Sequence, residues 1–257
     1  MKLGELGEWG LLAELMPGLP AGPEVVVGGG DDAAVIRGDG CWLLLTTDLL
    51  VEDVHFSLAY TGYRDLGYKA LAVNVSDIAA MGGQPTAAVV GLGLPPGTEV
   101  DDVRALYAGL REAAGLYGVS LVGGDTVASP RALTVSVALL GEVEPGRALL
   151  RSHAKPGDII CVTGELGAAA AGLAVLQRRL SCPPEVAAPL TRAHLRPTAR
   201  VGAGRMLAAS RGVGAVIDLS DGLLTDLGHI CRAGGVGCVL AVAQVPVAPG
   251  ARDLAAL

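Results

Sequence analysis

Aspartate side chains stand inside apolar runs at several points of this sequence, and their placement restricts how the chain can fold. They lie in the segments GGGDDAAV, LLLTTD, AVNVSDIAAM, LVGGD and AVIDLSDGLL, at Asp31, Asp32, Asp48, Asp77, Asp125, Asp218 and Asp221. The lysines that could pair with them are Lys2, Lys69 and Lys155 alone. Burying an ionised carboxylate without a partner costs several kcal/mol. The pattern therefore predicts a fold in which cations meet these carboxylates.

Single members of this set also fit structural roles. Asp31 and Asp125 suit turns, and Asp221 suits the N-terminus of a helix. Asp77 lies in the middle of an apolar helical pattern, where neither role applies. Oxygen ligands without a nearby His or Cys favour Mg²⁺ over zinc, copper or iron, and Thr46 and Thr47 could add oxygen ligands beside Asp48.

The charge of the chain excludes some partners and directs attention to others. The 257 residues carry 19 Lys plus Arg against 26 Asp plus Glu, a net charge of −7, and no basic run. Nonspecific nucleic-acid binding is therefore not expected. Phosphoryl transfer uses metal ions and few general bases, although the sequence has neither a GxxxxGK[ST] loop nor a GxGxxG loop. The expected nucleotide-binding fold is therefore a different one.

The cellular location follows from the cysteines and the N-terminus. The five cysteines include no CxxC pair, which predicts reduced thiols, with a zinc site as the alternative. No signal pattern and no apolar run long enough for a spanning helix is found. We therefore expect a cytoplasmic protein.

Apolar periodicity predicts a layered α/β domain over residues 1–146. Strands are expected at 42–46, 86–92 and 132–140, each of ordinary strand length. A helix buried on most faces is expected at 67–81, and a second helix from Thr98 to Gly118. A turn-rich basic segment at 145–157 marks the expected junction.

A second α/β domain is predicted over residues 147–257. Its expected strands are 158–162, 214–219 and 237–243, and its expected helices are 165–180, 198–210 and one from about 221. The last expected strand is followed by only fourteen residues, so this domain looks incomplete.

Seven segments in order resemble the thiamine-monophosphate kinase family, a branch of the aminoimidazole ribonucleotide synthetase-like ATP-binding superfamily. They are GGGDDAAV (28–35), TTDLLVEDVHF (46–56), GYKALAVNVSDIAAMGGQP (67–85), LVGGDT (121–126), RSHAKPGD (151–158), LRPTAR (195–200) and IDLSDGLLTDLGHI (217–230). The resemblance runs from about Gly4 to Val245. It implies a two-domain fold whose N-terminal mixed sheet forms a homodimer.

The resemblance also implies a reaction and a set of site residues. The reaction transfers the γ-phosphoryl group of ATP to thiamine phosphate and gives thiamine diphosphate and ADP, with several Mg²⁺ ions. The implied metal ligands are Asp32, Thr46, Thr47, Asp48, Asp77, Asp125, Asp218 and Asp221. The implied ATP contacts are Gly124, Asp125, Arg151 and Ser220, and His55 is the implied thiamine-phosphate contact, with a solvated turn histidine as its alternative. No general base is expected, because the attacking phosphate oxygen is already an anion near neutral pH.

One departure from the family leaves alternatives open. The family continues with a GGEDYEL-like segment and a further aromatic residue that help to hold thiamine, and this chain ends at ARDLAAL. The C-terminal domain is therefore expected to be truncated relative to the family. A related ATPase acting on another acceptor and a non-catalytic nucleotide-binding dimer are the two alternatives.

Overall fold

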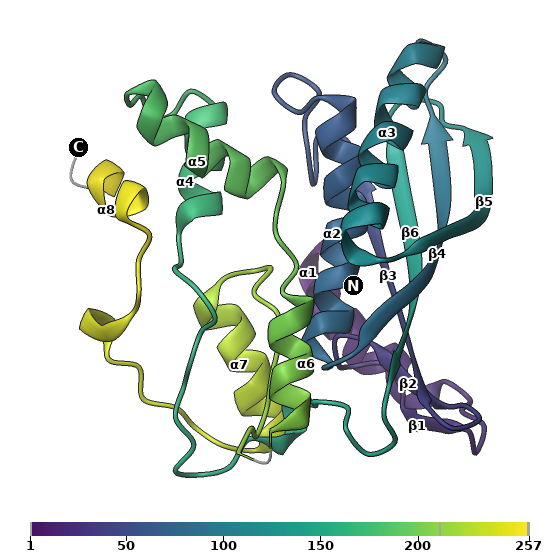
Figure 1. Cartoon of the computed structure of the whole chain (residues 1–257), viewed down its shortest axis with the longest axis vertical. Coiled ribbons are helices and arrows are strands. Elements are labelled where there is room, and N and C mark those ends of the chain that lie inside the picture. Colours follow the sequence, from purple (N-terminus) through teal and green to yellow (C-terminus); the bar gives the residue numbers. More distant parts are fainter. Residues whose placement is uncertain (1, 211, 256–257) are drawn as a thin grey trace.

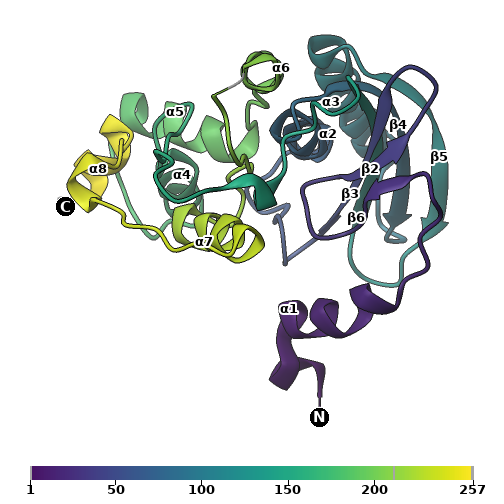
Figure 2. The same ribbon diagram turned by 90° about the horizontal axis from the view of Figure 1, so that it is seen from below.

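The elements of the protein lie in three layers, seen side by side in Figure 1. The computed structural model describes residues 2–210 and 212–255. A six-stranded sheet forms the first layer, helices α2 and α3 cover one of its faces, and further helices lie on the other side of α2 (Figures 1 and 2). The predicted mixed α/β fold class is confirmed.

The sheet has the strand order β1-β2-β3-β6-β4-β5, with β4 and β5 parallel and the other neighbours antiparallel. Its strands are β1 (Val25–Val27), β2 (Ala34–Arg37), β3 (Trp42–Val51), β4 (Gln84–Leu94), β5 (Ser120–Ala128) and β6 (Thr134–Val143). Strands predicted at 42–46, 86–92 and 132–140 correspond to β3, β4 and β6. The sequence patterns of β1, β2 and β5 did not predict strands.

Helices α2 (Tyr63–Ala80) and α3 (Val100–Tyr117) approach each other unusually closely. A Cβ atom on Gly67 would lie 2.0 Å from the carbonyl oxygen of Leu106, and one on Gly109 would lie 1.8 Å from that of Arg64. Only glycine fits where two backbones meet at such distances. Gly118, with a φ of 72°, ends α3 at the predicted residue.

The remaining described helices are short. They are α1 (Leu3–Leu15), α4 (Ala168–Leu176), α5 (Pro184–Leu195), α6 (Val201–Ala209), α7 (Leu223–Gly234) and α8 (Pro249–Ala255), with 3₁₀ turns η1 (Met16–Gly18), η2 (Arg151–His153) and η3 (Val242–Gln244). The predicted helices at 165–180, at 198–210 and from 221 correspond to α4, α6 and α7. A domain boundary near residue 146 stays a prediction.

Three predicted strands of the second half are wrong. Segments 158–162, 214–219 and 237–243 pair with no strand in the described part of the chain, and 242–243 belong to η3. Large apolar side chains in them are exposed, Ile159 at 86% and Val239 at 92%. Their β-branched composition suits a strand, but a strand also needs a hydrogen-bonded neighbour, which a local pattern cannot reveal. No helix of the described residues is both long and apolar enough to cross a bilayer.

The two faces of β3 have different environments, and this difference positions the candidate site. Leu44, Thr46 and Leu50 point to the layer of α2 and are buried, whereas Leu45 and Leu49 lie exposed on the open face. Such alternation follows from the two-residue period of a strand. Asp48 shares the face of Thr46, and so it lies on the side of α2.

Candidate active site

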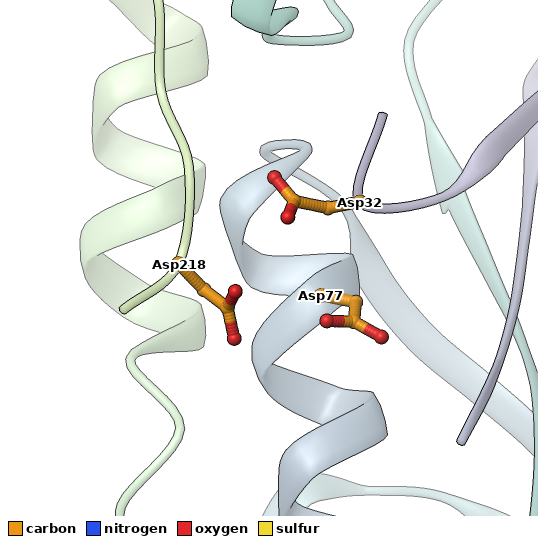
Figure 3. A group of neighbouring side chains, drawn as sticks. All are labelled: Asp32, Asp77 and Asp218. Atoms are coloured by element: carbon orange, nitrogen blue, oxygen red, sulfur yellow. The ribbon is translucent and has the colours of Figure 1, made fainter. Parts of the chain in front are cut away.

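Three carboxylates from distant parts of the sequence converge beside α2. Oxygen atoms of Asp32, Asp77 and Asp218 all lie within 4.8 Å of one another. Figure 3 shows that Asp32 comes from the loop before β2, Asp77 from α2 and Asp218 from the segment before α7. We call these three residues the carboxylate cluster.

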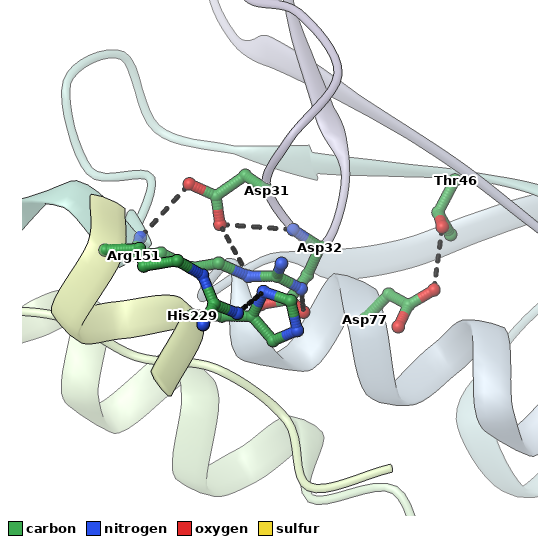
Figure 4. Close-up of polar contacts among 7 residues, drawn as sticks. Asp31, Asp32, Thr46, Asp77, Arg151 and His229 are labelled. Carbon is green, nitrogen blue, oxygen red and sulfur yellow. Dashed lines mark hydrogen bonds and ion pairs between the residues drawn. The ribbon is translucent and has the colours of Figure 1, made fainter. Parts of the chain in front are cut away.

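Neighbouring polar groups hold the edge of this cluster in place. The Thr46 hydroxyl donates a hydrogen bond of 2.7 Å to Oδ2 of Asp77 (Figure 4). The backbone N–H of Asp48 donates to Oδ1 of the fully buried Asn74, at 3.0 Å. Strand β2 pairs with β3 only as far as Leu45, so Asn74 takes the place of a strand partner there. Asp48 is thereby fixed next to the cluster.

Burial and mutual repulsion shift the protonation of the cluster. Burial, followed by the charges of Asp218 and Asp48, raises the pKa of Asp77 to about 9, against the opposing hydrogen bond from Thr46. Burial also raises the pKa of Asp32 to about 7, although Arg151 acts in the opposite direction. The pKa values of Asp218 and Asp48 are raised as well, chiefly by burial. Without a cation these carboxylates oppose one another in their charged forms.

Arg151 is held on the side of the cluster by two adjacent aspartates. Its guanidinium pairs with Asp32, and its backbone N–H donates to Oδ2 of Asp31 at 3.1 Å (Figure 4). The Arg151 Nε is buried and has no hydrogen-bond acceptor within the described residues. His229, drawn in Figure 4, has its Nδ1 3.0 Å from Nη2 of Arg232, and the charge of Arg151 also acts on it. One cationic group therefore stands beside the three carboxylates.

The cluster suits a hard divalent cation. Oδ2 of Asp32 is buried and has no partner in the part of the chain that the structure describes. The converging donors are carboxylate oxygens without sulfur or imidazole, which is the donor set that Mg²⁺ prefers. A cation would satisfy the orphaned oxygen and remove the repulsion within the cluster. The residues present fit the predicted metal.

The segment leading into α7 carries two further predicted residues. Ser220 and Asp221 are exposed, two and three residues beyond Asp218. The buried Asp226 accepts the backbone N–H of Gly222 at 3.0 Å and so fixes the entry into the helix. Ser220 and Asp221 therefore stand at the exposed N-terminus of α7, close in the chain to the cluster.

His55 lies just beyond the end of β3, whereas Thr47 lies within the strand. His55 is exposed just beyond the end of the strand, with Nδ1 accepting the N–H of Val51 at 3.0 Å, and its charge acts on Asp48. The Thr47 side chain lies on the opposite face of β3 from Thr46, and its hydroxyl donates to the carbonyl oxygen of Val137 at 2.9 Å. Of the two side chains, His55 is the one whose charge acts on Asp48.

Gly124 and Asp125 are not next to the carboxylate cluster. They lie on β5, and strands β6 and β4 separate β5 from β3, so Asp125 is roughly 14 Å from Asp48 across three strand spacings. A surface cavity of about 450 Å³ lies there, lined by Tyr107 and by Gly124, Asp125 and other residues of β4 and β5. The predicted site residues thus form two groups in one chain.

Sequence reasoning missed Asn74, Ser76 and Tyr107. Ser76 hydrogen-bonds to Asp218, and Asn74 supports Asp48. A polar residue three positions before Asp77 on a buried helix is a usable signal for Asn74, because i and i+3 share a helix face. Nothing in the pattern around Tyr107 separates it from an ordinary amphipathic helix residue.

The sheet of this chain matches a known protein family, and nearly the whole chain matches named enzymes. Residues 30–143, which hold the sheet from β2 onward, match the family model described as AIR synthase related protein, N-terminal domain. Thiamine-monophosphate kinase of Bacillus subtilis (strain 168) is 41% identical over 247 residues, covering 94% of this chain and 75% of that protein. The enzyme of the same name from Salmonella typhimurium is 43% identical over 245 residues, covering 93% and 73%.

Solved structures give the same picture. A structure described as AaThiL complexed with AMPPCP and TMP has a TM-score of 0.91 and 35% identity, covering all of this chain and 79% of that one. Thiamine-monophosphate kinase from Stenotrophomonas maltophilia K279a has a TM-score of 0.78 and 37% identity, covering 90% and 73%.

The segment that holds the mixed sheet, residues 30–143, has the class of an AIR synthase related protein, N-terminal domain. Within that class the identities extend well beyond the sheet, into the helices of the second half. The chain belongs to the thiamine-monophosphate kinase family and is an enzyme of that family.

Proposed function

We propose that this chain transfers the γ-phosphoryl group of ATP to thiamine phosphate and releases thiamine diphosphate and ADP. The observation that carries this proposal is the carboxylate cluster with Arg151 beside it. The relative described as AaThiL complexed with AMPPCP and TMP supports the choice of the two substrates.

The chain's own residues would bind and position two anions. Asp32, Asp77 and Asp218 would hold Mg²⁺, with Thr46, Asp48 and Asp221 as further proposed ligands. The Thr47 hydroxyl is turned away from this cluster, and Asp125 on β5 could meet only a separate ion, so these two predicted ligands do not belong to the cluster. When bound, Mg²⁺ would neutralise charge on the phosphates. The Nε of Arg151 lies 3.7 Å from Oδ1 of Asp31 and has no hydrogen-bond acceptor among the described residues. A phosphate oxygen would supply that acceptor, and a planar guanidinium suits the contact. Ser220 would contact ATP, and the exposed His55 would contact thiamine phosphate.

The second group of residues would hold another part of ATP. Gly124 and Asp125 line the cavity beside Tyr107, whose aromatic ring offers a surface for a flat base. Direct in-line transfer needs no general base, because a phosphate monoester has a second pKa near 6 and its attacking oxygen is already ionised.

The reaction is tested by incubating the protein with ATP, Mg²⁺ and thiamine phosphate and separating the products by chromatography. We expect thiamine diphosphate and ADP in equal amounts, and no product after EDTA treatment. ADP without thiamine diphosphate would indicate a different acceptor. ATP–Mg²⁺ binding without any ADP would indicate a non-catalytic nucleotide-binding protein.

We also propose that the open face of the sheet joins two copies of the chain. Leu45 and Leu49 of β3, Val89 of β4 and Leu140 of β6 are exposed on this face, and Leu45 pairs directly with Leu140. A contiguous exposed apolar face of this kind is typical of an interface.

We expect Leu45→Lys/Leu140→Lys to shift the mass in solution from two chains to one, measured by analytical ultracentrifugation. Leu116→Lys, at a more exposed leucine on α3, is the control and should leave the mass at two chains. A single-chain mass for the unaltered protein would contradict the dimer.

The proposed location is the cytoplasm. All five cysteines are free thiols, as expected in a reducing compartment.

A further inference from the structure

The segment between α5 and α6 is attached to both helices of the middle layer by one side chain. Nη1 of Arg196 lies 3.0 Å from Oδ1 of Asp65 on α2, and Nη2 pairs with Glu112 on α3. The guanidinium carbon lies 4.2 Å above the ring centre of Tyr68. Arg196 therefore bridges two helices and stacks on a buried ring, and the motif LRPTAR that contains it has no role in the cluster itself.

A second attachment follows three residues later. The hydroxyl of Tyr117 accepts the backbone N–H of Ala199 at 3.0 Å and lies 3.2 Å from the hydroxyl of Tyr68. Tyr68, Tyr117 and Ala199 are all buried. The segment 196–199 is thus fixed at both of its ends on the surface of α2 and α3.

From this attachment the chain runs through α6 and the segment after it to Asp218. Helix α6 lies so close to the end of α2 that a Cβ atom on Gly204 would be 2.0 Å from the carbonyl oxygen of Ala79. The segment after α6 then places Asp218 against Ser76 of α2. In the described residues no strand pairing ties segment 214–218 to the sheet. Arg205 of α6 adds a hydrogen bond of 2.9 Å from its Nη1 to the carbonyl oxygen of Gly82. The docking of 196–209 therefore helps to set where the third carboxylate lies.

We propose that Arg196 is a positioning residue that acts through Asp218, and this inference rests on the proposed function. By fastening segment 196–199 to Asp65, Glu112 and Tyr68, it holds Asp218 within reach of Asp77 and so completes the carboxylate cluster.

Electrostatics explains why a firm attachment is needed. The carboxylates of Asp32, Asp77 and Asp218 repel one another before a cation binds, and this repulsion favours moving the Asp218 segment away. Arg196 lies outside the cluster and bonds carboxylates of two helices at once. Its planar fork makes both contacts and the stacking contact together, which a lysine cannot do.

Direct binding of Mn²⁺ to the full chain tests the proposal without relying on activity. We expect Arg196→Ala to weaken Mn²⁺ binding about tenfold, the scale known for residues that orient metal ligands. Arg196→Lys should recover only part of the affinity. Arg104→Ala is the matched control, because Arg104 pairs only with the exposed Asp101 on its own helix, and it should leave the affinity unchanged.

A thermal melt of the metal-free protein gives an independent measurement. Asp218→Asn should raise the melting temperature in the unaltered chain, because it relieves repulsion, but not in the Arg196→Ala background, where Asp218 is no longer held. If Arg196→Ala does not fold, Tyr117→Phe replaces it, since it keeps the ring and removes the hydroxyl that accepts from Ala199 and contacts the Tyr68 hydroxyl.

Two results would overturn the proposal. One is Mn²⁺ affinity in Arg196→Ala equal to that of Arg104→Ala. The other is the same rise in melting temperature from Asp218→Asn in both backgrounds. Absence of thiamine diphosphate together with intact coupling between Arg196 and Asp218 would instead reject the proposed reaction alone.

Discussion

Asp77→Asn is expected to make the metal-free protein more stable and to remove phosphoryl transfer at the same time. Burial and the charges of Asp218 and Asp48 raise the pKa of Asp77 to about 9. At pH 8 the carboxyl must therefore take up a proton when the chain folds, which asparagine need not do, and asparagine keeps an oxygen that can accept the hydrogen bond from Thr46. At pH 8 we expect the free energy of unfolding without metal to rise by about 1–3 kcal/mol.

The effect of Asp77→Asn on metal-free stability can also be measured through its dependence on pH. An acid whose pKa is higher in the folded state binds more protons when folded than when unfolded. Its stabilising contribution is complete below the unfolded pKa of 3.8 and is lost as the pH rises towards about 9. The unaltered protein should therefore lose stability between these limits in EDTA, and Asp77→Asn should flatten that slope.

Activity should respond in the opposite direction from stability. With a metal ligand lost, we expect kcat to fall about 10³-fold, equivalent to about 4 kcal/mol of transition-state stabilisation. Asp101→Asn, at an exposed residue of α3, is the control and should change neither quantity. A lower metal-free melting temperature for Asp77→Asn would contradict the electrostatic argument.

Asp48→Asn is expected to abolish transfer while leaving the fold intact. The backbone N–H of Asp48, not its side chain, makes the hydrogen bond to Asn74, and the replacement has nearly the same shape. We expect kcat to fall about 10³-fold with loss of a ligand. The metal-free free energy of unfolding should not fall and should rise above neutral pH, because burial raises the pKa of Asp48 as well.

Steady-state kinetics and chemical unfolding in EDTA measure the two quantities for Asp48→Asn. Asp39→Asn, in the exposed turn between β2 and β3, is the matched control, because it removes an aspartate charge near the same strand but away from the cluster. Turnover equal to that of the unaltered protein would remove Asp48 from the metal site.

Much of the N-terminal architecture could be predicted, because its signals are local. Helix α2 is apolar almost all round, so its burial could be predicted from the sequence. Asp77 stood out in it as a carboxylate without a capping role. Strands β3, β4 and β6 are apolar runs of strand length. Strand β5 was missed because its glycines and exposed residues show no alternation of apolar and polar side chains.

The second half was harder to predict, because its signals depend on distant partners. Segments 158–162, 214–219 and 237–243 have strand composition, but pairing is decided by what lies beside them. Helix α5 was missed, with Pro184 at its start and Pro189 inside it.

The site shows the same limit. The residue types were visible in the sequence, but their grouping was not. Asp32, Asp77 and Asp218 converge, whereas Asp125 lies three strand spacings from Asp48. The supporting role of Asn74 depends on β2 ending early along β3, which only the strand register reveals.

Asp218 lies near the C-terminal end of the chain, and this position bears on the rates of folding and unfolding. Asp32 and Asp77 belong to a sheet-and-helix layer made of residues that leave the ribosome first, whereas Asp218 joins them only when α6 docks on α2. A contact that forms after the transition state changes the unfolding rate and leaves the folding rate nearly constant. If Asp218 joins the other two carboxylates after the transition state, a bound divalent cation at this junction would act mainly by lengthening the lifetime of the native state.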